Sequence, residues 1–420
     1  MPKILEFPDN FLWGSATSAY QIEGGIKNND WVKTYPTRRA PHHPAKAGDA
    51  GQACDHHNRY ETDFDLIKSL NQNAYRFSIE WSRIEPEEGK FSEKEIAYYR
   101  KILFSLRKKE IIPFVTLHHF TNPAWFAKTG GWTNKKSIFY FVRFARRVFE
   151  EYQGLVDFWI TINEPLIYAA NSYLKSVWPP KNKNPVLFLK VLKNQIKSHK
   201  KVYEIFHKNN LKVKVGIAKN NCFFEPYNKN SSLDRISVSL SRYFWNEYFL
   251  NRIHPVRDSE DKKKAKREQI SNGVKNNLDF IGLNYYFHNK IKFPWQIKNE
   301  NKIVSDMGWE IYPQGIYNVL KGLKKYNLPI YITENGLADA KDKLRKDFIK
   351  EHLYWIHRAI EERIDVRGYF HWSLLDNFEW EKGFKPRFGL IEVDYKTMER
   401  KPRPSAFYYA KICAENQLLI

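Results

Sequence analysis

Short apolar stretches recur along the whole chain, and each begins or ends in residues typical of turns. Their content of β-branched and aromatic residues predicts buried strands. Eight such stretches can be recognised, at 11–17, 73–81, 111–119, 155–165, 213–221, 278–286, 329–336 and 366–377. Amphipathic stretches lie between them, and those at 61–70, 138–152 and 347–362 carry apolar residues at the spacing of one helix face.

Continuous apolar strands that alternate with helices indicate a parallel sheet covered by helices, an α/β fold. Eight such units predict a (β/α)₈ barrel, although periodicity alone leaves an open doubly wound sheet as an alternative. A chain of 420 residues would often hold two or three domains, but a barrel with elaborated βα loops stays single at this size. No linker or repeat divides the sequence, so we predict one barrel domain over residues 1–420.

Polar and aromatic side chains gather where the predicted strands end, which is where barrels of this type carry their catalytic groups. They are His119, Asn163, Glu164, Asn284, Tyr286, Glu334 and Trp372. Glu164 closes the fourth stretch and Glu334 the seventh, so closure of the barrel should bring both carboxylates to one mouth. One such glutamate could equally turn toward water, because a buried carboxylate is costly to desolvate. The recurrence favours a functional pair.

Two carboxyl groups at one mouth suit the cleavage of a glycosidic bond. One group must hold a proton for the leaving oxygen, and the other must stay ionised to face the positive charge that develops on the sugar. Arg76, near the end of the second stretch, and a phenol in "LNYY" (283–286) could keep one carboxylate ionised.

Sequence motifs spread over residues 7–409 carry a resemblance to a known family. They include "FPDNFLWGSATSAYQIEGG" (7–25), "YRFSIEWSRI" (75–84), "TINEP" (161–165), "YITENG" (331–336) and "GYFHWSLLDNFEW" (368–380). In this order they resemble family 1 of the glycoside hydrolases, the retaining β-glucosidases and β-glycosidases. The resemblance implies removal of terminal β-glucosyl residues through a covalent glycosyl-enzyme, and it leaves galactosides and fucosides open as further substrates.

The resemblance also implies a role for each matching residue. Glu334 would be the nucleophile and Glu164 the acid and base, and Arg76, Tyr286 and Asn284 would support the nucleophile. The residues expected to hold the hydroxyls of the sugar are Gln21, His119, Asn163, Glu379 and Trp380, with Trp372 as a platform under its ring. Trp309 and Trp178 could form the walls of the leaving-group site, but packing roles fit them equally well.

Some positions depart from the family pattern, and rival functions are to be weighed. Phe120 stands where many members carry Trp, and Phe384 where many carry Tyr, which leaves substrate breadth open. The closest rival is a 6-phospho-β-glycosidase, but that branch carries a serine where this chain has Glu379, whose carboxylate would repel a phosphate. A non-catalytic carbohydrate-binding barrel is disfavoured because both glutamates are present.

The net charge of +22 raises nucleic acid as a partner, but the basic residues are spread out and match no nucleic-acid module. The densest run is "DKKKAKREQ" at 261–269. The expected partners are therefore small β-glycosides or oligosaccharides, and we expect binding to neither nucleic acid nor membranes. Assembly into a homo-oligomer remains possible on the sequence alone. High aromatic content, 16% of residues, suits sugar binding, although most rings are expected in the core.

The expected location is the cytoplasm. Three distant cysteines predict no disulfide framework, and the N-terminus lacks a secretory signal. Histidine pairs at 42–43, 56–57 and 118–119 could suggest a metal, but the spacing typical of metal ligands is absent. We expect neither a metal nor a cofactor.

Overall fold

The computed structural model describes residues 3–34, 49–256 and 276–420. Each of the eight predicted stretches contains a strand, and these strands close into a barrel in which every neighbouring pair is parallel. In barrel order they are β2 (Leu12–Ala16), β3 (Ala74–Ser78), β4 (Ile112–His118), β5 (Phe158–Asn163), β6 (Lys214–Asn220), β8 (Phe280–Asn284), β11 (Ile330–Asn335) and β12 (Val366–Trp372). The closed ring confirms the predicted barrel and excludes the open sheet.

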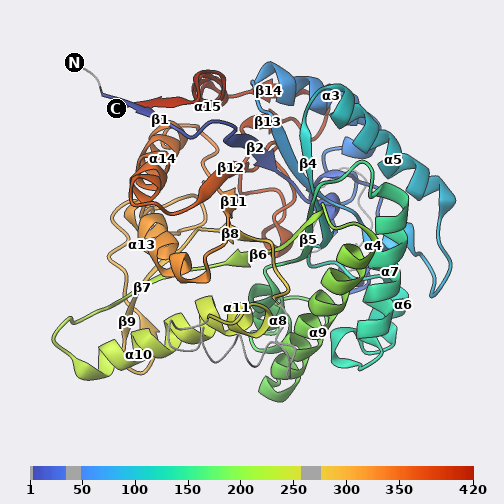
Figure 1. The fold of residues 1–420 in the computed structure, drawn as a ribbon, viewed down its shortest axis with the longest axis horizontal. Helices are drawn as coiled ribbons and strands as arrows, with labels where there is room; N and C mark the ends of the chain where they lie inside the picture. The colour runs from blue at the N-terminus through green and yellow to red at the C-terminus, as the bar shows by residue number, and fades with distance from the viewer. Residues whose placement is uncertain (1–2, 35–48, 257–275) are drawn as a thin grey trace.

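Helices surround the barrel, as Figure 1 shows. They include α3 (His56–Ser69), α5 (Glu93–Lys108), α7 (Ser137–Tyr152), α9 (Pro185–Asn209), α13 (Gln314–Leu323), α14 (Arg345–Glu361) and α15 (Pro404–Glu415). The three predicted amphipathic stretches lie in α3, α7 and α14. Side-chain caps start two of these helices: Ser92 accepts a hydrogen bond from the backbone of Glu95, and Asn184 from that of Val186 and Leu187.

Further elements lie in the connections between these strands and helices. The helices are α1 (Ala19–Ile22), α2 (Asp30–Thr34), α4 (Trp81–Ile84), α6 (Ala124–Lys128), α8 (Pro165–Tyr173), α10 (Ser232–Arg242) and α11 (Tyr248–Ile253), with helical turns η1 (Gly131–Thr133), η2 (Tyr243–Glu247), η3 (Lys324–Tyr326) and η4 (Trp380–Lys382). The strands are β1 (Ile4–Glu6), β7 (Phe223–Pro226), β9 (His288–Lys292), β10 (Gln296–Ile297), β13 (Ile391–Val393), β14 (Arg400–Pro402) and β15 (Gln417–Leu419). Antiparallel pairing of β1 with β15 brings the two ends of the chain together (Figure 1).

Aromatic rings fill the interior of the barrel. They come from Phe114, Phe158, Phe280, Tyr331 and Phe370, and the ring of Phe114 lies 4.2 Å from that of Phe158 and 4.8 Å from that of Phe370. A Cβ atom on Gly216 would lie 2.5 Å from the ring of Phe280, so only glycine leaves room for that ring. The barrel is therefore a packed core closed below its carboxyl ends, not a pore.

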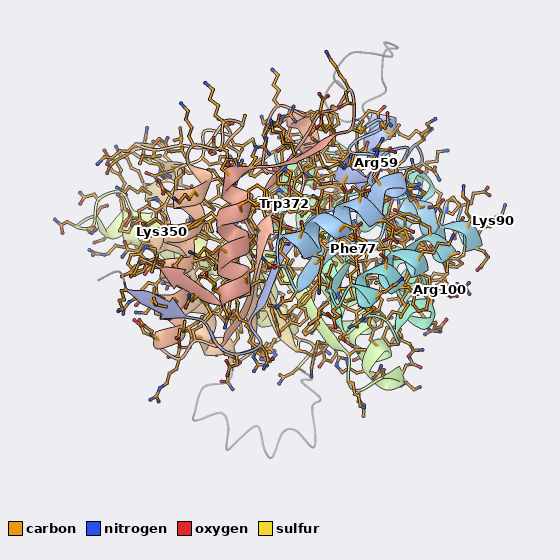
Figure 2. The ribbon with its side chains drawn as sticks, turned by 90° about the horizontal axis from the view of Figure 1, so that it is seen from above. Arg59, Phe77, Lys90, Arg100, Lys350 and Trp372 are labelled. Carbon is orange, nitrogen blue, oxygen red and sulfur yellow. The ribbon has the colours of Figure 1, made fainter. Side chains whose placement is uncertain are left out.

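Many charged side chains lie at the surface, away from this core. Figure 2 shows Lys90, Arg100 and Lys350 toward the edges of the molecule, while Trp372 lies near its centre. The basic run at 261–269 and the histidines at 42–43 lie outside the described residues. The three cysteines are buried and free, and within the described ranges no group of three or more His, Cys, Asp and Glu residues could hold a metal ion.

No helix in the described part of the chain has the length and apolar character needed to cross a membrane. The cytoplasmic location, the single domain and the oligomeric state stay predictions.

Asp376 anchors the loop that follows β12. Its carboxylate is fully buried and pairs with both terminal nitrogens of Arg403, at 2.8 and 3.1 Å, and with Arg387 at 3.2 Å. The backbone N–H of Gly389 donates a further hydrogen bond of 2.9 Å to it. These contacts tie the loop to the residue that precedes α15.

Replacing Asp376 by Ala should therefore lower the free energy of unfolding by about 3–5 kcal/mol, because two guanidinium groups lose a buried partner. Thermal unfolding of the variant and the wild type measures this loss. Asp365→Ala is the matched control, since the Asp365–Arg367 pair is half exposed and should contribute at most about 1 kcal/mol. Equal shifts in the two variants would contradict the anchoring role.

Candidate active site

Two glutamates meet in one cavity at the carboxyl ends of the barrel strands. Glu164 directly follows β5 and Glu334 lies in β11, and the two residues are only 7% and 4% exposed. Both line a cavity of about 310 Å³. Other residues around this cavity include His119, Phe120, Trp178, Asn220, Tyr286, Trp309, Trp372, Glu379, Trp380 and Glu381. The predicted convergence of the two carboxyl groups is thus present in the structure.

The Glu334 carboxylate is held by one cation and one hydroxyl. Arg76 donates from Nη1 to Oε1 at 2.6 Å, and the Tyr286 hydroxyl donates to Oε2 at 2.9 Å. Arg76 lies in β3 and is fully buried. Its other donors reach the backbone oxygen of Thr333 at 3.0 Å, Thr116 Oγ1 at 3.2 Å and Asn163 Oδ1 at 2.6 Å. Each nitrogen of the guanidinium thus has at least one acceptor, and such pairing is the condition under which a buried ion pair is stable.

Glu164 has amide partners in place of a cation. Asn284 and Asn220 each donate from Nδ2 to its Oε1, at 2.9 and 3.1 Å. No ion pair to Glu164 forms within the described ranges. Its backbone adopts a left-handed conformation, with φ of 42°, just before Pro165 opens α8. Such a conformation is unusual for a glutamate and is found where the surrounding structure fixes a side chain for function.

A continuous set of hydrogen bonds joins the two glutamates. Asn284 donates to Asn163 Oδ1 at 3.2 Å as well as to Glu164, and Arg76 donates to the same Asn163 oxygen and to Glu334. The relative position of the two carboxyl groups is therefore fixed by side chains from four strands, β3, β5, β8 and β11.

The different partners give the two carboxyl groups different affinities for a proton. Burial raises the pKa of Glu164 to about 8, and the negative charge of Glu334 adds to the rise. Burial also raises the pKa of Glu334, but Arg76 and the Tyr286 hydroxyl oppose that rise. A guanidinium in contact stabilises a carboxylate more than an amide does. Glu334 is therefore the group that ionises first, and Glu164 is the one that keeps its proton near neutral pH.

Aromatic rings and a neutral histidine form the opposite side of the cavity. The ring of His119 lies nearly parallel to those of Trp372 and Trp380, at 6.0 and 6.1 Å. Burial lowers the pKa of His119 well below its usual range. Asn163 Nδ2 is 3.3 Å from His119 Nε2, which places the proton of the neutral ring on Nδ1. That nitrogen is buried and has no hydrogen-bond partner among the described residues.

Gly336 permits the placement of Trp372. A Cβ atom on Gly336 would lie 1.7 Å from the backbone oxygen of Trp372, so no larger residue fits beneath that tryptophan. The glycine two residues after Glu334 is thus required by this close approach.

Four of the expected site residues lie behind the cavity surface. Arg76, Asn163 and Asn284 form the network between the glutamates, and Gln21 donates to the backbone oxygen of Phe378 at 2.8 Å and to Glu379 at 3.5 Å. Gln21 is therefore placed to orient Glu379. Trp178 and Trp309 both line the cavity, the former donating to Glu381 Oε2 at 2.6 Å.

Asn220 is the residue that the sequence reasoning missed. It ends β6 and donates to Glu164. The stretch at 213–221 closes on two asparagines, which is the same kind of polar strand end that identified Asn163 and Asn284.

Comparison with known proteins agrees with this geometry. The sequence model described as glycosyl hydrolase family 1 matches residues 4–418. This chain belongs to glycosyl hydrolase family 1. It is therefore a glycoside hydrolase, as the motifs predicted.

Relatives in this family match over their full length. The protein named β-glucosidase A from Thermotoga maritima is 36% identical, and the match covers 99% of that protein and 99% of this chain. A solved β-glycosidase from Pyrococcus horikoshii is 39% identical with a TM-score of 0.88, and the match covers 100% of this chain and 96% of that one. A solved β-glucosidase from Thermotoga maritima in complex with glucoimidazole is 35% identical with a TM-score of 0.89, over 98% of this chain and 99% of that one.

Removal of one carboxylate should change the proton affinity of the other. In Glu334→Gln we expect the pKa of Glu164 to fall below its value of about 8, because loss of a nearby negative charge favours the ionised form of Glu164. Carbon-13 NMR of labelled glutamate carboxyls across pH measures this. Glu381→Gln is the control, since Glu381 lines the same cavity but bonds to Trp178. An unchanged pKa in Glu334→Gln would show that the two groups do not interact.

Proposed function

We propose that this family 1 hydrolase is a retaining β-glycosidase that removes terminal, unphosphorylated β-D-glucosyl residues by double displacement. The observation that carries the proposal is the unequal pair of carboxyl groups, with Glu334 against Arg76 and Glu164 against two amides. Relatives named β-glucosidase support glucose as the sugar. Galactosides and fucosides remain further candidates.

In the first step the ionised Glu334 attacks the anomeric carbon. The bond from that carbon to the leaving oxygen breaks as an ester bond to Glu334 forms, and Glu164 gives its proton to the leaving oxygen. The pKa of Glu164, about 8, keeps it protonated and ready at neutral pH.

In the second step water replaces the leaving group. Glu164, now ionised, takes a proton from the water while the water oxygen attacks the anomeric carbon. The ester bond then breaks and returns Glu334 as a carboxylate. Formation of the ester removes the negative charge of Glu334, which lowers the pKa of Glu164 and so favours its role as a base. Two inversions at one carbon give net retention of configuration.

The sugar would lie against Trp372, with its hydroxyls held by polar groups on several strand ends. These are Gln21, His119, Asn163, Glu379 and Trp380, where Gln21 acts through Glu379 and Asn163 through His119. A buried polar group left unpaired costs about 1–3 kcal/mol, so a sugar whose hydroxyls all find partners is favoured.

A 6-phosphorylated sugar fits this cavity poorly. Four carboxyl groups line it, Glu164, Glu334, Glu379 and Glu381. Burial first, and then the charges of the other three, raise the pKa of Glu379 well above its usual range. A phosphate dianion would add to that charge.

The reaction can be tested with 4-nitrophenyl β-glucoside, its galacto and fuco analogues and its 6-phospho form. We expect hydrolysis of the unphosphorylated glucoside with β-glucose as the first product, observed by proton NMR. Glu334→Gln should lower kcat by ~10³-fold or more, since the attacking oxygen loses its charge. Glu361→Gln, an exposed glutamate on α14, is the control. First release of α-glucose, or turnover of the 6-phospho form alone, would contradict the proposal.

The role of Glu379 gives a second test. Glu379→Ser should reduce kcat/KM for the unphosphorylated glucoside by ~5- to 150-fold, because two hydrogen bonds to the sugar together contribute about 1–3 kcal/mol. Steady-state kinetics measures the loss, and Glu381→Ser should lose less because Glu381 is bonded to Trp178. Equal losses in the two variants would place Glu379 outside the sugar site.

A further inference from the structure

A lysine is buried in an apolar layer of the barrel, at a position that the proposed reaction does not use. Lys219 lies near the carboxyl end of β6 and is only 1% exposed. In this strand Ala218 belongs to the packed interior of the barrel, whereas Val215 and Ile217 belong to the core outside it. Because side chains alternate along a strand, Lys219 lies on the same outer side as Val215 and Ile217.

Burial of this amine is costly. It lowers the pKa of Lys219 to about 7, although Cys222 and Glu164 oppose the change. The amine nitrogen Nζ donates to the backbone oxygen of Asn220 at 2.6 Å and to that of Trp245, and both acceptors are uncharged. An apolar side chain would fill the same position without the cost of removing an amine from water. The lysine therefore has a role other than packing.

The two carbonyl groups that Lys219 binds belong to segments far apart in the sequence, the end of β6 and the π-helical turn η2. Further hydrogen bonds join the same two segments. The indole N–H of Trp245 donates to Asn220 Oδ1 at 3.3 Å. The backbone N–H of Cys222 donates to Asn246 Oδ1 at 3.0 Å, and Asn246 Nδ2 donates to the backbone oxygen of Cys222 at 2.8 Å. Turns of this π type occur frequently at functional sites.

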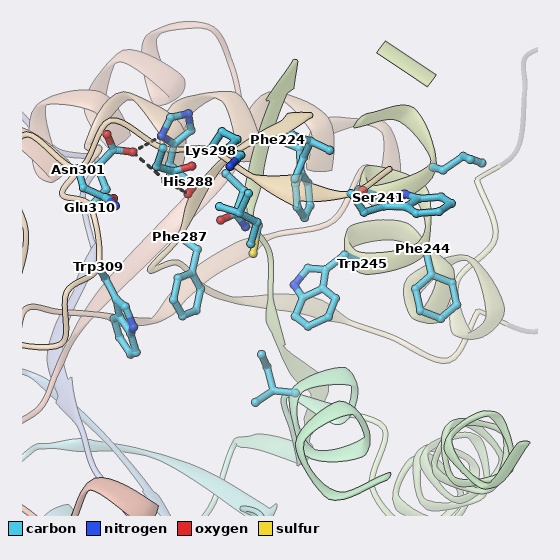
Figure 3. A pocket seen from close by; sticks show the side chains of 18 of the residues that line it. Phe224, Ser241, Phe244, Trp245, Phe287, His288, Lys298, Asn301, Trp309 and Glu310 are labelled. Atoms are coloured by element: carbon cyan, nitrogen blue, oxygen red, sulfur yellow. Dashed lines mark hydrogen bonds and ion pairs between the residues drawn. The ribbon is translucent and has the colours of Figure 1, made fainter. Parts of the chain in front are cut away.

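Trp245 lies in the wall of a second cavity, which is larger than the catalytic one and next to it. The volume of this second cavity is about 1040 Å³, and α10, η2, β9 and β10 all contribute to its wall. Figure 3 shows the ring of Trp245 in this wall, together with those of Phe244 and Phe287. Because open space borders the ring of Trp245, packing covers only part of it, and its bonds to Lys219 and Asn220 supply the remaining restraint.

The bond from Trp245 decides which end of the Asn220 amide faces the catalytic acid. Oδ1 of Asn220 accepts from the indole, so Nδ2 is the end that reaches Glu164 Oε1, at 3.1 Å. The reversed amide would set one oxygen against another and one N–H donor against another. The hydrogen bond from Asn220 also lowers the pKa of Glu164. Lys219 binds the backbone of both Asn220 and Trp245, and so restrains both members of this pair.

We propose that Lys219 is a positioning residue for the catalytic acid, because it holds Asn220 and Trp245 in the arrangement that aims the Asn220 amide at Glu164. The proposal rests on the proposed glycosidase function and adds a residue to it. The role of Lys219 does not depend on its charge. An ammonium group has three N–H donors and a neutral amine has two, which is enough for the two carbonyl groups in either state.

Lys219→Met, which keeps a long side chain but removes its donors, can be tested with two glucosides that differ in their need for an acid. The methoxide of methyl β-glucoside leaves only with a proton from Glu164, whereas 2,4-dinitrophenolate leaves without one. We expect kcat/KM to fall ~10-fold or more for methyl glucoside and less than ~3-fold for 2,4-dinitrophenyl glucoside. A purely structural role would lower both values alike. The matched control is Lys214→Met, at an exposed lysine in the same strand, which should change neither value.

Carbon-13 NMR of the Glu164 carboxyl separates this proposal from the glycosidase proposal, because it needs no turnover. It is applied to Lys219→Met and to Trp245→Phe, which keeps an aromatic ring but loses the N–H that orients Asn220. In both variants the pKa of Glu164 should rise by ~0.5–1 above its value of about 8, since the hydrogen bond from Asn220 no longer lowers it. Such a rise in a protein that hydrolyses no glucoside would support the positioning role and refute the glycosidase proposal alone. An unchanged pKa in both variants, or equal losses on the two glucosides in Lys219→Met, would overturn the positioning role and leave the glycosidase proposal standing.

Discussion

The buried ion pair between Arg76 and Glu334 is the interaction on which the catalytic arrangement depends. Arg76 in β3 reaches across the barrel to β11, which is not its neighbour in the sheet, and also bonds to side chains that follow or lie in β4 and β5. A guanidinium without exposure to water is stable only while all of its donors are paired. The requirement to satisfy this cation therefore fixes Thr116, Asn163 and Glu334 in one place, and the position of the proposed nucleophile follows from it.

Glu164 shows the opposite solution to the same burial. Both carboxyl groups are almost fully enclosed, yet one faces a guanidinium and the other faces the amides of Asn284 and Asn220. An amide can donate to a carboxyl oxygen in either protonation state, whereas a guanidinium strongly favours the charged state. Two glutamates thus differ in proton affinity through their neighbours alone. Because amides tolerate both protonation states, Glu164 can serve as the acid in one step and as the base in the next.

Those parts of the architecture that repeat could be predicted from the sequence. All eight barrel strands were recognisable because a strand buried on both faces has a continuous apolar pattern, and the glutamates at the ends of β5 and β11 interrupt that pattern. Asn220 escaped notice because an asparagine at the end of a strand is equally typical of a turn. The second cavity could not be foreseen, since α10, η2, β9 and β10 are insertions without a period, and their apolar residues have no pattern that distinguishes a cavity wall from a core.

Glu164 and Glu334 lie in the smaller of two neighbouring cavities, and the two cavities share Ile167, Lys175, Phe287 and Trp309. Hydrogen bonds on the sugar side are directional, so each hydroxyl that changes position loses a partner and the sugar is selected closely. The catalytic acid is also tied to the larger cavity, because Trp245, which lines that cavity, donates to Asn220, and Asn220 donates to Glu164.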